Sequence, residues 1–356
     1  MKISKNYNLE KINAFKVKVK AKYFAALSKE SDLNDLFKNT SIRKEKIFIL
    51  GDGTNTLFTK DFDGLIIKNE IKGIKIVKEK NDAVVVELGA GENWHKFTQY
   101  AINKGWAGVE NLSLIPGTVG AAPVQNIAAY GQNFEDVFES LTAVNLTSGK
   151  EKVFTKGECQ FGYRESVFKK DLKGKYIITK VRLKLSKQGR TDFSYHSRYD
   201  SLIEELSKFA KPPYSLSDIS KAVIAIRERK FPNWKGVGTA GSFFLNPVIT
   251  KKKLAELQKK FPELQYYPVD KLSYPKTNDP TFNHNDYVKI PAGWLLEELG
   301  WKGKTIGKVA TSPAQALVVI NNGGATYKDI LSFAEKMQKD FYKSFKIKLE
   351  PEVNIV

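Results

Sequence analysis

The amino-acid sequence predicts an α+β fold. Short runs of β-branched and aromatic residues dominate the first 90 residues, which is typical of strands. From residue 92 onward apolar residues also recur at helical spacing, and beyond residue 215 helices and strands alternate. With 356 residues, the chain is long enough for two or three domains with buried cores.

Apolar patterns predict the elements of the first half. Trp94, Phe97 and Ala101 are spaced as one face of a helix that ends at Gly105. Residues 141–155 are typical of a hairpin. Strands are predicted at residues 47–50, 64–68, 74–77, 84–88 and 176–185.

A boundary near residue 215 separates this half from the rest, because Lys211-Pro212-Pro213 cannot continue a helix. The helix that follows can be capped by Ser217. The later predicted elements are a helix near 251–260, an element at 294–299, a strand at 317–320, an amphipathic helix with Ile330, Phe333, Ala334, Met337 and Phe341 on one face, and a last strand at 347–356.

The chain is strongly basic, with 58 Lys and Arg residues against 39 Asp and Glu and a formal charge of +19. Such a charge can indicate a polyanionic partner. Only seven of these cations are arginine, the residue that nucleic-acid readers use for bidentate contacts, and the 51 lysines are scattered. We therefore expect a lysine-rich, solvated surface and no nucleic-acid partner.

Other classes are excluded by what the sequence lacks. No apolar run approaches the roughly 20 residues that span a bilayer, and the first residues do not resemble a secretory signal. Cys159 is the single cysteine, which excludes an internal disulfide and a multi-cysteine metal cluster. His95 and His196 are expected to be packing or surface residues. We therefore predict no membrane association, no metal site and a cytoplasmic, reducing location.

Two glycine motifs follow predicted strands. Residues 89–94, GAGENW, stand between a strand and a helix as a dinucleotide fingerprint would, but Trp94 replaces its third glycine and Glu92 would repel a pyrophosphate. Residues 51–56, GDGTNT, fit an anion better, since two glycines let successive N–H groups converge. A tight hairpin turn explains GDG equally well, and the residues alone leave both interpretations open.

A third unusual segment covers residues 115–131, IPGTVGAAPVQNIAAYG. Small residues at this density let a backbone run against a large flat ligand, and Thr118, Gln125 and Asn126 can orient it. A glycine-rich surface loop is the alternative, but Val119 and Ile127 are too apolar for that. We therefore favour burial against a cofactor.

The chain contains, in order, GDGTNTLF, GAGENWHKF, ENLSLIPGTVGAAPVQNIAAYG, FGYRES, TAGSFFLNP, AGWLLEELGWKG, QALVVIN and LEPEV. Together these motifs resemble the UDP-N-acetylenolpyruvoylglucosamine reductase family, in its subtype with a tyrosine substrate loop. The resemblance covers residues from about 15 to the end.

The resemblance implies two FAD-binding subdomains of the vanillyl-alcohol-oxidase type and a C-terminal α+β substrate domain. We place them at residues 1–71, 72–214 and 215–356, with the last strand, 347–356, returning to the active site. It also implies non-covalent FAD, NADPH as co-substrate, a UDP-sugar substrate and a monomer. The implied FAD contacts are Gly51, Asp52, Gly53, Thr54, Asn55, Thr56, Pro116, Gly117, Thr118, Gly120, Ala121, Gln125, Asn126, Ala129, Tyr130 and Gly131.

Three catalytic residues are implied by their place in the family motifs. Arg164 in FGYRES matches the arginine that stabilises an enolate, because charge develops on the substrate after hydride addition. Ser242 in TAGSFF matches the serine that protonates carbon, and Glu352 in LEPEV matches the carboxyl group that assists it. The implied substrate contacts are Tyr163, Tyr199 (with Tyr195 as the alternative), Arg227, Lys230, Asn246, Lys302 and Gln315.

One departure and two alternatives remain. Asn354 stands where the family often has arginine, which puts one cationic contact in doubt. A flavin oxidoreductase of the same fold with another substrate is a second possibility, against which FGYRES, TAGSFF and LEPEV argue. A basic binding protein that keeps the fold without flavin is the third.

Overall fold

The computed structural model describes residues 2–189, 201–231, 236–269 and 283–356. The chain divides into two compact units. One comprises Met1–Tyr7, Ala21–Asp52 and Phe62–Arg227, and the other comprises Asn8–Lys20, Gly53–Asp61 and Glu228–Val356. The chain therefore passes between the units five times, once within the GDGTNT motif between Asp52 and Gly53 and for the last time between Arg227 and Glu228. The division into three domains at residues 71 and 214 stays a prediction.

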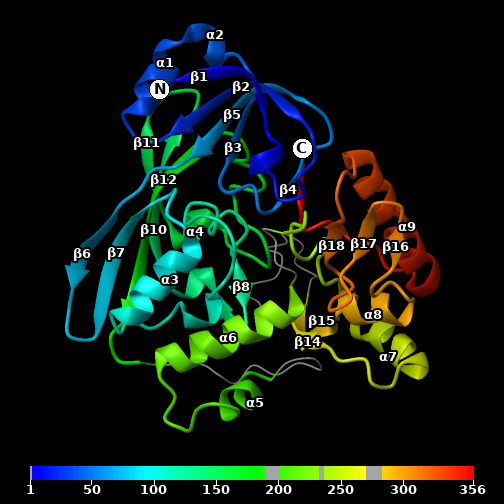
Figure 1. Ribbon diagram of the computed structural model, residues 1–356. Helices are drawn as coiled ribbons and strands as arrows, with labels where there is room; N and C mark the ends of the chain where they lie inside the picture. The colour runs from blue at the N-terminus through cyan, green and yellow to red at the C-terminus, as the bar shows by residue number, and fades with distance from the viewer. Residues whose placement is uncertain (1, 190–200, 232–235, 270–282) are drawn as a thin grey trace. The chain divides into compact units, whose positions relative to one another are not determined.

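The first unit contains a four-stranded sheet in which two neighbouring strands both pair in parallel with the strand between them. Its order is β1 (Ile3–Asn8), β2 (Lys20–Leu27), β5 (Phe62–Asn69) and β3 (Ile47–Leu50). Helices α1 (Asp32–Lys38) and α2 (Thr40–Arg43) follow β2 (Figure 1). Leu27, Leu36 and Ile67 share one apolar core between the sheet and these helices.

A five-stranded antiparallel sheet forms the rest of the unit's framework. Its order is β11 (Glu151–Thr155), β10 (Phe138–Asn145), β12 (Tyr176–Ser186), β7 (Ala83–Gly89) and β6 (Ile74–Glu79). Helix α3 (Trp94–Asn103) packs on it, and Trp94, Phe97 and Ala101 are buried in its core, which confirms the predicted face. Short elements complete this region: β8 (Ala128–Ala129), β9 (Gln132–Asn133), α4 (Lys156–Cys159), and 3₁₀ helices at Glu110–Leu112 and Phe134–Asp136.

Two helices after residue 200 share a small core with Tyr130 of the glycine-rich segment. They are α5 (Leu202–Ser207) and α6 (Leu216–Lys230), and Leu206, Val223 and Ile226 are fully buried in it. The predicted cap of α6 was wrong. Ser215, not Ser217, accepts a hydrogen bond from the Asp218 N–H at 3.1 Å, and the Asp218 carboxylate accepts one from the Ser215 N–H in return.

In its described residues the second unit contains small antiparallel sheets and α-helices. One sheet has the order β13 (Val248–Thr250), β15 (Tyr287–Lys289) and β14 (Tyr267–Pro268), and another has the order β16 (Thr305–Ile306), β17 (Val309–Thr311) and β18 (Val319–Asn321). The helices are α7 (Lys251–Lys260), α8 (Ala292–Glu298) and α9 (Tyr327–Phe345), with 3₁₀ helices at Glu10–Ile12 and His284–Asp286. The five predicted apolar residues of α9 are all buried.

The predicted last strand is mostly not a strand. Within residues 347–356 only β19 (Asn354–Ile355) is one, and it pairs in parallel with β4 (Thr56–Leu57) of the GDGTNT motif. Pro351, which has no N–H to donate, makes only an isolated bridge with Phe244. The end of the chain is therefore joined to the candidate cofactor turn by main-chain hydrogen bonds.

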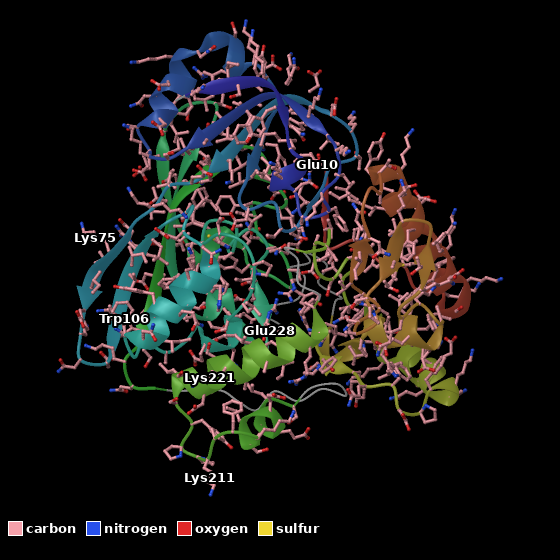
Figure 2. All side chains as sticks on the ribbon, in the orientation of Figure 1. Glu10, Lys75, Trp106, Lys211, Lys221 and Glu228 are labelled. Carbon is pink, nitrogen blue, oxygen red and sulfur yellow. The ribbon has the colours of Figure 1, made fainter. Side chains whose placement is uncertain are left out.

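The lysines lie largely at the surface, as the composition predicts. Lys75, Lys211 and Lys221 are exposed side chains of the first unit (Figure 2). Several others form ion pairs that are open to solvent, such as Lys22 with Glu45 at 2.9 Å. Exposed pairs of this kind contribute about 0–1 kcal/mol each, so they add solubility more than stability.

Candidate active site

The turn at residues 51–56 has a backbone that suits an anion. Gly53 adopts φ +67°, and a Cβ there would lie 2.1 Å from the main-chain oxygen of Ile12, so only glycine fits. Among the described residues, the main-chain N–H groups of Asp52, Gly53 and Thr54 have no hydrogen-bond acceptor. Three successive N–H groups without a protein acceptor favour the nest interpretation over a closed hairpin turn.

The glycine-rich segment, residues 115–131, approaches this turn at Gly51, in the part of the turn that belongs to the first unit. A Cβ on Gly51 would lie 2.8 Å from Thr118 Oγ1. The N–H groups of Gly117 and Thr118 also have no acceptor in the part of the chain that the structure describes. Two segments that sequence reasoning assigned to FAD are therefore adjacent.

Burial explains the apolar residues of this segment. Val119 and Ile127 belong to the core of the five-stranded sheet. Gly120 donates from its N–H to the Ala90 oxygen at 2.7 Å, and a Cβ on Gly120 would lie 2.5 Å from Ala90 Cβ. The segment is thus a fixed part of the fold, and the surface-loop alternative is wrong.

The GAGENW motif has a packing role. A Cβ on Gly91 would lie 2.4 Å from the main-chain carbon of Glu70, and Trp94 is buried in the core. Asn93 caps α3 by accepting from the Lys96 N–H at 3.0 Å, and Glu92 accepts from the Gly73 N–H at 2.8 Å. The N–H groups of the glycine turn are also engaged within the protein, because Ala90 donates to the Thr179 oxygen at 2.9 Å and Gly91 to the Ile71 oxygen at 2.8 Å.

Leu114, just before the glycine-rich segment, is held on both sides. It adopts φ +57°, its N–H donates to His95 Nδ1 at 3.0 Å, and its carbonyl oxygen accepts from Arg227 Nε at 3.3 Å. His95 was predicted only as a packing or surface residue; no sequence pattern indicated this hydrogen bond. Burial, together with the charge of Arg227, lowers the pKa of His95, so the imidazole stays neutral and can accept this bond.

Arg227, predicted to bind the substrate phosphates, lies in α6 with Lys230 at the end of that helix. Burial lowers the pKa of Arg227, and the charge of Arg164 lowers it further, while a hydrogen bond with Tyr130 opposes the shift. An arginine remains charged despite such shifts. The first unit therefore brings two of the predicted cationic site residues within electrostatic range of each other.

Arg164 lies in a tight turn. Gly162 and Glu165 exchange main-chain hydrogen bonds of 3.0 and 3.2 Å around it, and Arg164 itself adopts φ +56°. The Glu165 carboxylate pairs with Lys170 at 2.6 Å. The ring of Tyr163 lies 5.9 Å from the Arg164 guanidinium carbon.

The second unit brings Ser242 and Glu352 into neighbouring segments. Residues 242–245 run between two other segments: Phe243 N–H donates to the Leu317 oxygen, and Glu352 N–H donates to the Phe243 oxygen, each at 2.8 Å. Ser242 itself bridges Val318. Glu352 is thus hydrogen-bonded to Phe243, the residue that follows Ser242. The two predicted catalytic residues of this unit are therefore close in the fold although they are distant in sequence.

Asn55 connects Glu352 to the candidate cofactor turn. Its Nδ2 donates to the Glu352 carbonyl oxygen at 3.3 Å, and its own carbonyl oxygen accepts from the Asn354 N–H at 3.0 Å and from Asn354 Nδ2 at 3.2 Å. Asn354, which stands where the family often has arginine, therefore holds this turn. The sequence did not indicate that role.

The predicted substrate residues of the second unit separate into two places. Asn246 Oδ1 accepts from the Ala292 N–H at 3.0 Å, and a Cβ on Gly293 would lie 2.5 Å from Gln315 Oε1, so both side chains meet the start of α8. Lys302 is exposed beyond the other end of α8, 3.4 Å from Glu297. Tyr199, its alternative Tyr195 and His196 lie outside the described residues.

The residues of this turn fit FAD on structural grounds. A Cβ on Gly53 would meet the Ile12 main-chain oxygen and a Cβ on Gly51 would crowd Thr118. Among the described residues the N–H groups of Asp52, Gly53 and Thr54 have no protein acceptor, as a diphosphate ligand would require. In the described ranges no group of three His, Cys, Asp or Glu side chains is arranged for a metal, and no described helix is long and apolar enough to cross a bilayer.

Comparisons with known proteins identify two family domains in the chain. Residues 21–155 match the model of an FAD-binding domain, and residues 232–356 match that of the UDP-N-acetylenolpyruvoylglucosamine reductase C-terminal domain. The fold and site thus define a flavin-binding oxidoreductase with a dedicated C-terminal domain.

A reductase of this name from Flavobacterium johnsoniae is 42% identical over all of both chains, and one from Burkholderia multivorans is 39% identical over 96% of this chain and 93% of its own. The crystal structure of such a reductase from Thermus caldophilus has the same fold, with a TM-score of 0.65 and 20% identity over 99% of this chain and 98% of that one. The chain belongs to the UDP-N-acetylenolpyruvoylglucosamine reductase family.

Proposed function

We propose that this protein reduces the enolpyruvyl ether of UDP-N-acetylglucosamine to UDP-N-acetylmuramate, with NADPH as reductant, in peptidoglycan precursor synthesis. FAD, when bound, supplies hydride transfer from the nicotinamide to the vinyl carbon of the substrate. The observation that carries the proposal is the neighbouring placement of Ser242 and Glu352, the predicted proton donor and its assistant. Identity with the named reductases over the full chain supports it.

Each residue's role follows from the charge that the reaction creates. Hydride addition leaves negative charge on the substrate beside its carboxylate, and the Arg164 guanidinium can stabilise it through two parallel N–H donors. Ser242 then donates a proton to carbon. An unperturbed hydroxyl is a weak acid, so we assign Glu352 to assist that transfer from the neighbouring segment. Arg227 and Lys230 add positive charge for the diphosphate of the UDP-sugar.

Partners and location are proposed on the same basis. The enzyme acts as a monomer in the cytoplasm, on small molecules rather than nucleic acid or membranes. Cys159, a free and buried thiol, is consistent with a reducing compartment.

Two measurements test the proposal directly. The purified protein should be yellow and should release intact FAD on denaturation; a colourless protein that binds no FAD would support the binding-only alternative. Turnover of the UDP-sugar should then be compared with NADPH and NADH. Failure to reoxidise the reduced flavin with this substrate would leave the same-fold oxidoreductase as the better interpretation.

A serine variant tests the assigned proton donor. Ser242→Ala should leave flavin reduction by NADPH unchanged and slow reoxidation by the UDP-sugar by about 10²–10⁴-fold, the usual worth of a positioned acid. Ser332→Ala, at an exposed position of α9, is the matched control and should change neither step. Stopped-flow absorbance separates the two half-reactions, and equal slowing of both would remove Ser242 from this role.

A further inference from the structure

Arg164 stands in a conformation that its neighbours must enforce. Its φ of +56° belongs to the left-handed region, which side chains with a Cβ rarely adopt. Such a residue persists where surrounding contacts determine the backbone, and it often marks a functional position. The question is therefore which contacts fix the turn at residues 162–165.

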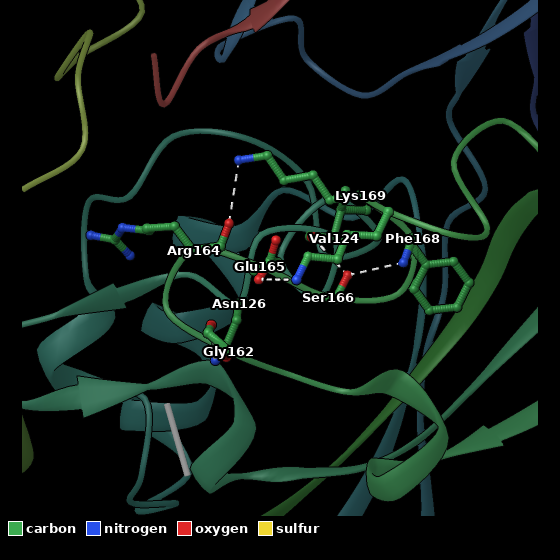
Figure 3. Close-up of polar contacts among 9 residues, drawn as sticks. Val124, Asn126, Gly162, Arg164, Glu165, Ser166, Phe168 and Lys169 are labelled. Atoms are coloured by element: carbon green, nitrogen blue, oxygen red, sulfur yellow. Dashed lines mark hydrogen bonds and ion pairs between the residues drawn. The ribbon is translucent and has the colours of Figure 1, made fainter. Parts of the chain in front are cut away.

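Two side-chain hydrogen bonds attach this turn to the glycine-rich segment (Figure 3). Asn126 Nδ2 donates to the Gly162 oxygen at 3.1 Å, and Ser166 Oγ donates to the Val124 oxygen at 2.7 Å. One bond lies two residues before Arg164 and the other two residues after it. In the glycine-rich segment the bonded residues are Val124 and Asn126, which flank Gln125 in the segment assigned to FAD.

Both anchoring side chains are buried and use their remaining polar groups within the protein. Ser166 is fully buried, and its hydroxyl oxygen accepts from the Phe168 N–H at 3.3 Å. Asn126 is 3% exposed; its Oδ1 accepts from the Glu135 N–H at 3.1 Å, and its Nδ2 also donates to the Glu135 carboxylate at 3.0 Å. Neither side chain can change rotamer without leaving buried groups unbonded.

We propose that Ser166 and Asn126 are positioning residues that hold Arg164 in register with the cofactor-lining segment. The inference rests on the proposed function, because it assigns these residues to the arginine that stabilises charge on the substrate. They act through Arg164: the two bonds fix the peptides on both sides of it, so the guanidinium is presented from a defined backbone. The Asn126 side-chain amide bonds the Arg164 turn and Glu135, and its predicted contact with the cofactor stays a prediction.

The main test removes one anchor from the FAD-loaded enzyme. Ser166→Ala should leave flavin reduction by NADPH and the affinity for FAD unchanged, and should slow flavin reoxidation by the UDP-sugar by about 10- to 100-fold, since small displacements of a positioned group cost that much. Thr179→Val is the matched control, because it also deletes a fully buried hydroxyl of the first unit, one that donates to the Thr142 oxygen at 3.4 Å. If both variants slow reoxidation equally, Ser166 has only a structural role.

A spectroscopic readout is independent of turnover. The chain has seven arginines, so their Nε–H signals can be resolved and that of Arg164 assigned by its loss in Arg164→Lys. Ser166→Ala should shift or broaden this signal, and Thr179→Val should not. If Ser166→Ala fails to fold, Ser166→Cys keeps a weak donor of similar size and should give an intermediate rate and shift. An unchanged Arg164 signal would overturn the proposal.

A double-mutant cycle separates failure of this inference from failure of the proposed function. If Ser166 acts through Arg164, Ser166→Ala should slow reoxidation by no more than about twofold in the Arg164→Lys background. Full additivity of the two effects would overturn positioning while leaving Arg164 in its role. Normal turnover of Arg164→Lys alone would instead remove Arg164 from the proposed mechanism.

Discussion

Replacing Gly53 by alanine should disrupt the cofactor turn through two separate effects. The first is conformational, because alanine at φ +67° costs about 1–2 kcal/mol. The second is steric, because the new Cβ would lie 2.1 Å from the Ile12 oxygen, a distance that real Cβ atoms essentially never show. Relief requires a shift of nearly 1 Å in one of two main-chain segments.

The opposing segment cannot move easily. The buried side chain of Asn13 holds this segment with three hydrogen bonds. Its Nδ2 donates to the Leu9 oxygen at 2.8 Å and to the Val17 oxygen at 3.0 Å, and its Oδ1 accepts from the Val17 N–H at 3.0 Å. Forcing such packing apart costs about 1–3 kcal/mol. The two effects together predict a loss of roughly 2–5 kcal/mol, a large part of the roughly 5–15 kcal/mol that stabilises a typical protein.

The assay compares Gly53→Ala with Gly307→Ala, a glycine of the same unit. Gly307 has φ +59° and no atom within 4 Å of an added Cβ, so it carries the conformational effect alone. Chemical denaturation should show the larger loss for Gly53→Ala, and FAD titration should show at least about a tenfold weaker affinity, the worth of one charge-assisted hydrogen bond. Equal destabilisation of the two variants with unchanged FAD affinity would refute the reasoning.

Three further outcomes are expected. Burial raises the pKa of Cys159 to about 12, so at pH 8 only about one thiol in 10⁴ is ionised; a thiol reagent should label it only as the protein unfolds, and rapid native-state labelling would contradict this. Because the folded-state pKa of His95 is lowered, the stability from its neutral form is present above its ordinary pKa of about 6.5 and is lost as the pH falls below it. His95→Asn keeps an acceptor, so its thermal midpoint should fall less than that of the wild type between pH 6.5 and 5, and parallel curves would contradict the assignment. Gly120→Ala should destabilise the protein by about 1–3 kcal/mol, and adding Ala90→Gly should restore part of it; no restoration would mean that the clash is not with the Ala90 methyl.

Local patterns predicted most of the framework because its elements follow periodicity. The strands at residues 47–50 and 84–88 and the long helix α9 are amphipathic or apolar over their whole length, so burial and local preference agree. The last strand was overestimated because residues 347–353 are tied to other segments singly rather than in a continuous ladder. The cap at Ser215 was missed because two serines flank the start of α6 and only the backbone geometry chooses between them.

The candidate site was predicted mainly through family motifs, and the contacts that hold it were not. Ser166 and Asn354 lie inside those motifs, yet nothing in the sequence shows that one bonds Val124 and the other Asn55. His95 presents the same difficulty, since a lone histidine near a helix start has no periodic partner. Long-range hydrogen bonds from single polar side chains leave no pattern along the chain, so only the folded structure reveals them.

The three glycine-containing segments show why composition alone could not separate cofactor binding from packing. In GAGENW the missing side chains make room for protein: Gly91 faces the backbone at Glu70. Gly53 likewise faces Ile12, but there the neighbouring N–H groups have no acceptor within the described parts of the protein. In both motifs glycine thus indicates that another main-chain segment lies too close for a side chain. Main-chain N–H groups without an acceptor are what distinguish a ligand-binding turn from a packed one. The glycine-rich segment approaches Gly51 at Thr118 and bonds the Arg164 turn through Asn126, so one stretch of chain contacts both the turn proposed for the cofactor and the turn that carries the cation proposed for the substrate.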